Sequence, residues 1–395
     1  MIGFADTPWE VFSLAGIFFS GLSLLPWMCR VLSVQLRHGL ALYLWHSLFC
    51  VIYILYSMGN PADTINYFIL SLTWDQPPAL GTRFVIFFNS FLTQGLGLSY
   101  GGSFFVYNIL GSIGLIAFSA AMREAFAGKS RRVRQVIAIL PFLPGFSFWS
   151  TAIGKDSIAF FSVGLICWAA ASPYRRFLAI LIGIVALVAV RPHMAGFLMI
   201  ALALAFSLIR EGSLQLKLLI SSLVLPTAAA IGVISLSYIG LEELDGLTEY
   251  VDQRQSYNTE GGSSIDIANA SVPMRMFMFV FRPLFFDAGG GLGLIVSFEN
   301  LVLLGLLFGT LVGVIKRDSS LTRFQRVFFL IYVAVSWLAL ANITANMGIA
   351  IRQKTMFTPM LLMLMLSYLP NTRLIPHRTP SVVPPTGRPL NLPGP

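Results

Sequence analysis

The chain has 395 residues, of which 56% are hydrophobic and only 11% are charged, and its mean hydropathy is +0.78. This composition excludes an ordinary soluble globular protein and predicts a protein that crosses a lipid bilayer many times. The formal net charge of +9 does not indicate a nucleic-acid partner, because the basic residues lie in short segments between apolar runs, where the positive-inside rule explains them.

The apolar runs predict an all-α bundle of about 11 transmembrane helices within residues 1–370. The runs are Val11 to Cys29, Gly39 to Ser57, Ser103 to Ala121, Gln135 to Trp149, Ser157 to Ser172, Phe177 to Val190, Met194 to Ile209, Leu218 to Tyr238, Leu301 to Ile315, Val327 to Asn342 and Thr355 to Tyr368. The first run follows Asp6 and Glu10 rather than a basic segment, which indicates a retained span and not a cleaved signal peptide.

The basic residues also predict an orientation. With the amino terminus outside, the cytoplasmic segments hold 18 of the 26 Lys and Arg residues and only 3 of the 17 acidic ones. The carboxyl terminus is then cytoplasmic, and the Pro-rich residues 371–395 form a disordered tail. We expect a location in the bacterial inner membrane.

Two long outer loops, residues 58–102 and 240–300, interrupt the spans. In the first, Thr64 to Trp74 and Phe84 to Leu98 are apolar but short, which suits helices lying at the membrane interface. The second begins acidic and becomes rich in Gly and Ser, which is typical of a mobile loop over a substrate.

One stretch, Pro141 to Ser157, combines two prolines, an aromatic cluster and the charged pair Lys155 and Asp156. Ionisable groups at the end of a broken apolar run indicate a functional site, because they are costly at membrane depth. The three cysteines have neither CxxC nor Cys/His spacing, so neither a disulfide framework nor a metal site is predicted.

The predicted topology places the unusual polar residues on the outer side of the membrane. Only 14 residues separate Arg176 from Arg191, and at about 1.5 Å each they cover roughly 21 Å of a core about 30 Å thick, which places Arg191 in a cavity below the outer surface. Several cations there suit a phosphate or pyrophosphate, and a carboxylate could take a proton from an attacking hydroxyl. The unusual polar residues on this side are Asp63, Lys155, Asp156, Arg191, His193, Arg282, Asp287, Glu299, Arg352 and Lys354.

Each of these residues also has a structural interpretation. Asp156 could cap the helix that follows it, and the cations Lys155, Arg191, Arg282 and Arg352 could be anchors at the ends of spans. His193 could be a structural hydrogen-bonding group. Trp149 could belong to an interfacial belt or stack on a sugar ring.

The motifs FWSTAIGKDS, RPH, FRPLFFDAGGGLGLIVSFENL and NMGIAIRQKTMFTPML, with the early GNPADTINYF, resemble bacterial membrane glycosyltransferases and polysaccharide polymerases of the Wzy/EpsG-like group, which are related to GT-C glycosyltransferases. The resemblance implies a GT-C-like fold and a polyprenyl-linked donor. It implies a general base at Asp63, and the other positions that match the family motifs are Lys155, Asp156, Arg191, Arg282, Glu299 and Arg352. In the expected reaction the cations bind the phosphate, and Glu299 or His193 is an alternative base. Trp149 and Tyr67 are further candidate substrate-binding residues. Many GT-C enzymes have paired acidic residues in the first loop, whereas this chain has a single Asp there. Whether the reaction needs a divalent cation therefore stays open.

The expected function is therefore transfer of a sugar or oligosaccharide from a polyprenyl phosphate or pyrophosphate to a glycan acceptor at the extracytoplasmic face, alone or with other polysaccharide-assembly proteins. No cofactor is predicted. Two other functions stay open: a transporter or flippase for lipid-linked glycans, and a scaffold subunit of a polysaccharide-assembly complex.

Overall fold

The computed structural model describes residue 4 and residues 6–60, 62–208, 270–316, 319–344 and 346–370, with positions 215, 222, 224 and 226–231. This part of the chain is all-helical and has no strand, which confirms the predicted all-α class, while the count of about 11 spans and the GT-C-like fold stay predictions. The acidic start of the second loop, most of the run from Leu218 to Tyr238 and the tail 371–395 lie outside the described residues.

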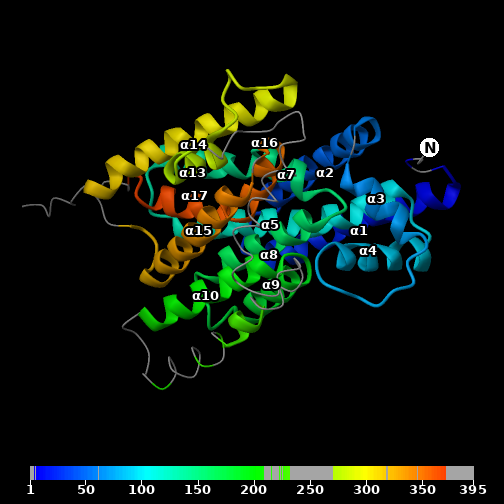
Figure 1. The fold of residues 1–395 in the computed structure, drawn as a ribbon, viewed down its shortest axis with the longest axis horizontal. Coiled ribbons are helices and arrows are strands. Elements are labelled where there is room, and N and C mark those ends of the chain that lie inside the picture. Colours follow the sequence, from blue (N-terminus) through cyan, green and yellow to red (C-terminus); the bar gives the residue numbers. More distant parts are fainter. Residues whose placement is uncertain are drawn as a thin grey trace, which may run out of the picture.

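Five described helices are long and apolar enough to cross a membrane: α1 (Pro8–Val31), α2 (Leu36–Gly59), α5 (Tyr100–Ala125), α14 (Gly290–Lys316) and α15 (Arg323–Ile343). Four shorter apolar helices accompany them: α9 (Phe177–Val190), α10 (Pro192–Leu208), α13 (Val272–Phe281) and α17 (Thr358–Ser367). In Figure 1, α14 lies along one side of the bundle and α9 and α10 along the other, with α5 and α8 (Lys155–Ala169) between them. The chain is therefore a helical membrane protein by the length and composition of its helices.

The predicted fourth span, Gln135 to Trp149, is broken into α6 (Arg131–Ile139), a 3₁₀ turn η2 (Leu140–Phe142) and α7 (Pro144–Ser150). The breaks fall at Pro141 and Pro144, because proline has no N–H to donate and is tolerated only in the first turn of a helix. After α7, residues 151–154 leave the helical path and α8 begins at Lys155. The prolines thus set where the Lys155 and Asp156 pair emerges.

Two short helices, α3 (Asp63–Ser71) and α4 (Thr82–Ser90), with the π-helical turn η1 (Phe91–Gly95), fill the first predicted outer loop and cover one end of the bundle (Figure 1). The second predicted outer loop is not a simple loop, since it contains α13 and the first eleven residues of α14. The hydropathy pattern missed this start because Glu299 and Asn300 interrupt the apolar run, and both side chains are buried in the bundle.

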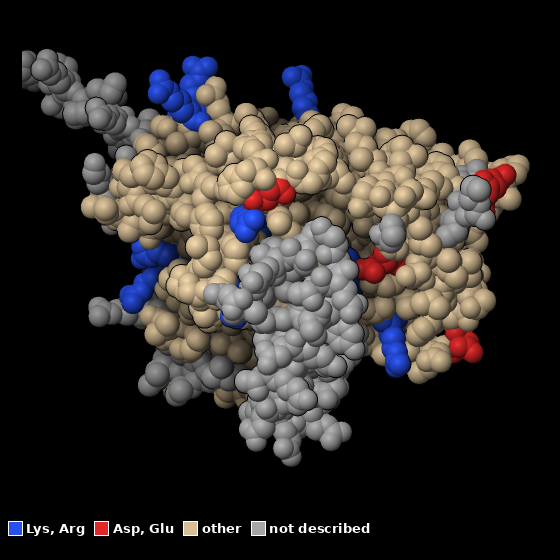
Figure 2. Space-filling view, turned by 45° about the horizontal axis from the view of Figure 1, so that its top comes forward, with Lys and Arg blue, Asp and Glu red and all other residues tan. Residues whose placement is uncertain are grey.

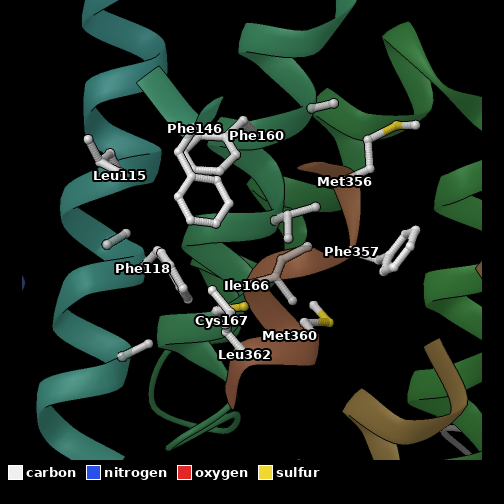
Figure 3. Close-up of a cluster of buried hydrophobic side chains, with 14 of the residues drawn as sticks. Leu115, Phe118, Phe146, Phe160, Ile166, Cys167, Met356, Phe357, Met360 and Leu362 are labelled. Atoms are coloured by element: carbon white, nitrogen blue, oxygen red, sulfur yellow. The ribbon is translucent and has the colours of Figure 1, made fainter. Parts of the chain in front are cut away.

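The core forms around α5, which packs closely against α8. Their backbones meet at two glycines: a Cβ added at Gly114 would lie 2.6 Å from the Cα of Phe161, and one added at Gly164 would overlap the carbonyl oxygen of Gly114. Small residues allow such close packing of helices in membranes. Figure 3 shows aromatic and aliphatic side chains of α5, α7, α8, α17 and the turn before it (η4, Lys354–Met356) filling the space beside this contact.

Many large apolar side chains lie on the surface of the described part of the molecule. In the view of Figure 2, Lys, Arg, Asp and Glu occupy only a few separate places on a face made mostly of other residues. Large apolar side chains such as Phe12, Phe177 and Phe308 are exposed on α1, α9 and α14, at 72%, 62% and 70% of their surface. In water such exposure would be costly, so this surface suits contact with lipid chains.

The glycine contact gives a test of the fold. We expect Gly164→Ala to destabilise the protein by about 1–3 kcal/mol, because the added methyl group must push α8 away from α5. Thermal unfolding in detergent measures the change. The control is Gly16→Ala, where an added Cβ meets nothing within 4 Å; equal unfolding temperatures for the two variants would contradict the packing described.

Candidate functional site

A buried aspartate lies at the centre of the site. Asp156 belongs to the first turn of α8 and only 4% of its surface is exposed. One of its oxygens, Oδ1, accepts a hydrogen bond from Arg191 Nη2 at 2.7 Å, and the other, Oδ2, accepts one from Arg352 Nε. Because charged partners strengthen such bonds, this carboxylate holds two guanidinium groups in place. Asp156 is therefore more than a helix cap.

Arg191 reaches Asp156 from the junction of α9 and α10. The residue before a proline is disfavoured in the helical conformation, so α9 ends at Val190, Arg191 adopts φ −145° and ψ 66°, and α10 begins at Pro192. The Arg191 side chain is buried, and its Nε has no hydrogen-bond partner among the described residues. An unused buried donor is unfavourable, so a bound acceptor group would stabilise it.

Arg352 comes from α16 (Met347–Gln353) and connects Asp156 to Asp63 at the start of α3. Its Nη1 donates to Asp63 Oδ2 at 2.8 Å. The two carboxylates differ sharply in exposure, since the side chain of Asp63 is 55% exposed and that of Asp156 is 5% exposed. Asp63 is therefore the carboxylate of this cluster that a substrate could reach.

Hydrogen bonds fix α3, which carries Asp63. Thr64 Oγ1 bonds the Tyr100 hydroxyl at 2.8 Å, and the same hydroxyl bonds Ser57 Oγ at 2.9 Å. These groups join α3 to α5 and α2. In a site that must hold a carboxylate within hydrogen-bonding reach of a substrate, such supporting contacts keep the side chain in position.

Lys155 lies beside this cluster. Its Nζ donates to Thr82 Oγ1 of α4 at 3.0 Å, and Thr82 also bonds the hydroxyl of Tyr67. Gly154, which precedes Lys155, lies next to the same neighbours: a Cβ added there would be in ordinary contact with the Tyr67 ring at 3.7 Å and with Arg352 Nη2 at 4.0 Å. Tyr67, a predicted substrate-binding residue, thus lies beside Lys155 and Arg352.

Two further predicted residues lie around the cluster. His193 is within electrostatic range of Arg191 and Lys155, and its ring meets Phe197 with centroids 6.4 Å apart. Trp149 packs edge-on against Tyr53, with ring centroids 6.0 Å apart, and Tyr53 is in turn within electrostatic range of Arg352 and Asp156. Trp149 therefore forms part of the aromatic support behind the charges.

The five charged residues of this cluster, Asp63, Lys155, Asp156, Arg191 and Arg352, are called the Asp156 cluster below. It contains three cations and two carboxylates, so it carries a formal excess of one positive charge. A site with this balance, in which Arg191 Nε has no partner among the described residues, favours an anionic group. Within the described ranges, no group of three or more His, Cys, Asp and Glu side chains that could hold a metal gathers here or elsewhere.

Glu299 lies in a second buried cluster, separate from Asp63. Its Oε1 accepts a hydrogen bond from the Gly145 N–H at 2.6 Å, and it lies within electrostatic range of Lys354. Lys354 Nζ donates to the Val280 carbonyl oxygen at 3.1 Å and to the side-chain oxygen of Asn300. This cluster ties α7 and η4 to α13 and α14, and with 7% exposure Glu299 is less accessible than Asp63.

Arg282 is not brought to the Asp156 cluster by any contact among the described residues. It pairs instead with Asp287: Arg282 Nε donates a hydrogen bond to Asp287 Oδ2 at 2.7 Å, and Arg282 Nη2 donates one to Asp287 Oδ1 at 3.0 Å. The hydrogen bonds from Arg282 lower the pKa of Asp287, so the stability that this pair contributes is present above the ordinary pKa of aspartate and is lost as the pH falls through the lowered value. Its role is to close the turn between α13 and α14.

The sequence patterns did not reveal the polar network beneath α7. His46 Nδ1 and Asn108 Oδ1 are 2.6 Å apart, and His46 Nε2 is 2.8 Å from Ser150 Oγ. All three residues are buried, and they join α2, α5 and the last residue of α7. The network fixes the chain just before it turns toward Lys155. The signal in the sequence that could have revealed this network is the presence of polar residues inside apolar helices.

The ion pairs of Asp156 give a test. Asp156→Ala leaves the buried guanidinium group of Arg191 without its carboxylate and removes one of the two carboxylate partners of Arg352, and we expect a loss of about 3–5 kcal/mol in the free energy of unfolding. The matched control is Glu124→Ala, which removes the surface partner of Arg176 and should cost less than about 1 kcal/mol. Thermal unfolding of both variants in the same detergent measures the two losses of stability. Similar small losses would contradict the conclusion that Asp156 holds the cluster together.

Comparisons of this chain with protein-family models, with curated proteins and with solved structures find no match. The chemistry of the Asp156 cluster is therefore the basis on which we propose a function.

Proposed function

We propose that this chain is a membrane glycosyltransferase or polysaccharide polymerase. It transfers a sugar or oligosaccharide from a polyprenyl phosphate or pyrophosphate to a glycan acceptor at the extracytoplasmic face of a bacterial inner membrane, with its amino terminus outside. The observation that carries this proposal is the Asp156 cluster, where cations and one exposed carboxylate from distant parts of the chain meet at the end of an apolar bundle.

The cations of the cluster suit the leaving group. When the bond between the anomeric carbon and the phosphate oxygen breaks, the phosphate keeps the electron pair and gains negative charge. Lys155 can stabilise that charge through Nζ, and Arg191 through its unused Nε–H. Asp156 keeps Arg191 and Arg352 at fixed positions, so little rearrangement is needed when the charge develops.

Asp63 suits the role of general base. The acceptor hydroxyl attacks the anomeric carbon, forms the new glycosidic bond and gives up its proton to a carboxylate. In the proposed reaction Asp63 takes that proton, because it is exposed and Arg352 contacts only one of its oxygens. Asp156 is unsuited to this task, since arginines engage its two oxygens.

The phosphate part of the proposal is tested by binding. Undecaprenyl phosphate and undecaprenyl pyrophosphate are titrated into the purified protein in nanodiscs. Arg191→Ala should weaken the binding of at least one of them by about 10- to 100-fold, because a charge-assisted hydrogen bond is lost. Arg175→Ala, at an exposed arginine that precedes the first residue of α9 while Arg191 follows its last, should bind like the unchanged protein. Unchanged binding by Arg191→Ala would contradict a phosphate site.

The base is tested by separating binding from transfer. Asp63→Asn keeps an oxygen for Arg352 but cannot accept the proton, so we expect unchanged binding of the lipid phosphate and transfer slowed by about 10²- to 10⁴-fold. Transfer is measured as growth of a lipid-linked oligosaccharide in proteoliposomes. Normal growth with Asp63→Asn excludes it as base, and movement of the lipid across the bilayer without glycan growth would favour a flippase.

A further inference from the structure

A groove lies on the surface of the bundle where α2, the broken segment from α6 to α7, and α14 meet. Its volume is 490 Å³, and it is lined by Trp45, Ile139, Phe142, Leu143, Pro144, Leu294, Ile295 and Phe298. None of these side chains carries a charge, and Ile139 and Phe298 are 66% and 58% exposed. The proposed transfer reaction uses none of these residues.

An exposed face of α6, which begins at Arg132 beside Arg131 and is called the basic stripe below, leads into this groove. At 100° per residue, Arg132, Gln135, Val136 and Ile139 share one face of the helix, and all four are exposed. Val133 and Ile137 point the other way and are buried. Seven residues of helix place the Cα of Arg132 about 10 Å from that of Ile139 at the groove. Arg131 is exposed one position earlier and adds a second positive charge.

The start of α6 is held firmly against the end of α17. Lys129 is 1% exposed, and its Nζ donates to the carbonyl oxygens of Ser367 and Leu369, each at 2.6 Å. A cation at the carboxyl end of a helix is favoured by the helix dipole. Arg352 precedes the other end of α17, so the basic stripe and the Asp156 cluster lie near opposite ends of that helix.

We infer that the stripe and the groove together bind an anionic phospholipid, with its phosphate on Arg131 and Arg132 and one acyl chain along the groove. Charge complementarity selects an anionic head group, and the continuous path from charge to apolar groove matches a molecule that is charged at one end and apolar along its length. An apolar protein helix would fill the groove, but the two arginines would then stay in contact with water and not with the occupant. The site does not depend on the proposed transfer reaction.

The experiment uses the full chain in detergent, titrated with phosphatidylglycerol or phosphatidylcholine that carries bromine on one acyl chain. Bromine quenches nearby tryptophan, and comparison with Trp45→Phe isolates the signal of Trp45 among the 7 tryptophans. We expect quenching of Trp45 at about 25-fold lower concentration with phosphatidylglycerol, since each of the two arginines favours an anionic lipid by about fivefold.

Replacing the arginines identifies the head-group contact. The double variant Arg131→Ala with Arg132→Ala should lose the preference for phosphatidylglycerol, while Arg175→Ala should keep it. Because these arginines are exposed, the variants should fold, and thermal stabilisation by each lipid gives a second readout that needs no change at Trp45. Equal effects of the two lipids, or no quenching, would overturn the inference. Displacement of phosphatidylglycerol by undecaprenyl phosphate at tenfold lower concentration would overturn the assignment to a phospholipid.

Discussion

The carboxylate of Asp156 is the group on which the rest of the site depends. A buried charge is stable only when it is paired, and Asp156 has its two oxygens occupied by arginines that lie 35 and 196 residues away along the chain. The helices that carry these arginines must therefore end close to the start of α8. Asp63 joins through Arg352, so three separate segments meet at one carboxylate.

Breaks in the helices make this meeting possible. Pro144 starts α7 and Pro192 starts α10, so the chain changes direction just before Lys155 and at Arg191. Close packing of Gly114 against Gly164 then holds α8 in place. The charged side chains thus lie at or near the ends of helices, while the apolar faces of these helices fill the core (Figure 3).

Hydropathy and helix-breaking residues predict much of this architecture. Spans such as Phe177 to Val190 match their helices because local composition decides where an apolar helix forms. Arg191 and Arg352 could be identified from the sequence as candidate site residues, because charged residues inside apolar sequence are rare. Their common partner could not be predicted, since nothing in the sequence near Asp156 records which distant residue packs against it. For the same reason the sequence grouped Arg282 with the other cations, whereas it pairs locally with Asp287.

The direct test of this account is a double-mutant cycle between Asp156 and Arg352, with Asp156→Asn, Arg352→Gln and the double variant compared by chemical unfolding in one detergent. If the ion pair organises the site, the effects are not additive, and the coupling reaches about 1–3 kcal/mol. The double variant should then lose less free energy of unfolding than the sum of the losses of the two single variants. Additive losses would contradict the account, because they would show that Asp156 and Arg352 stabilise the protein independently.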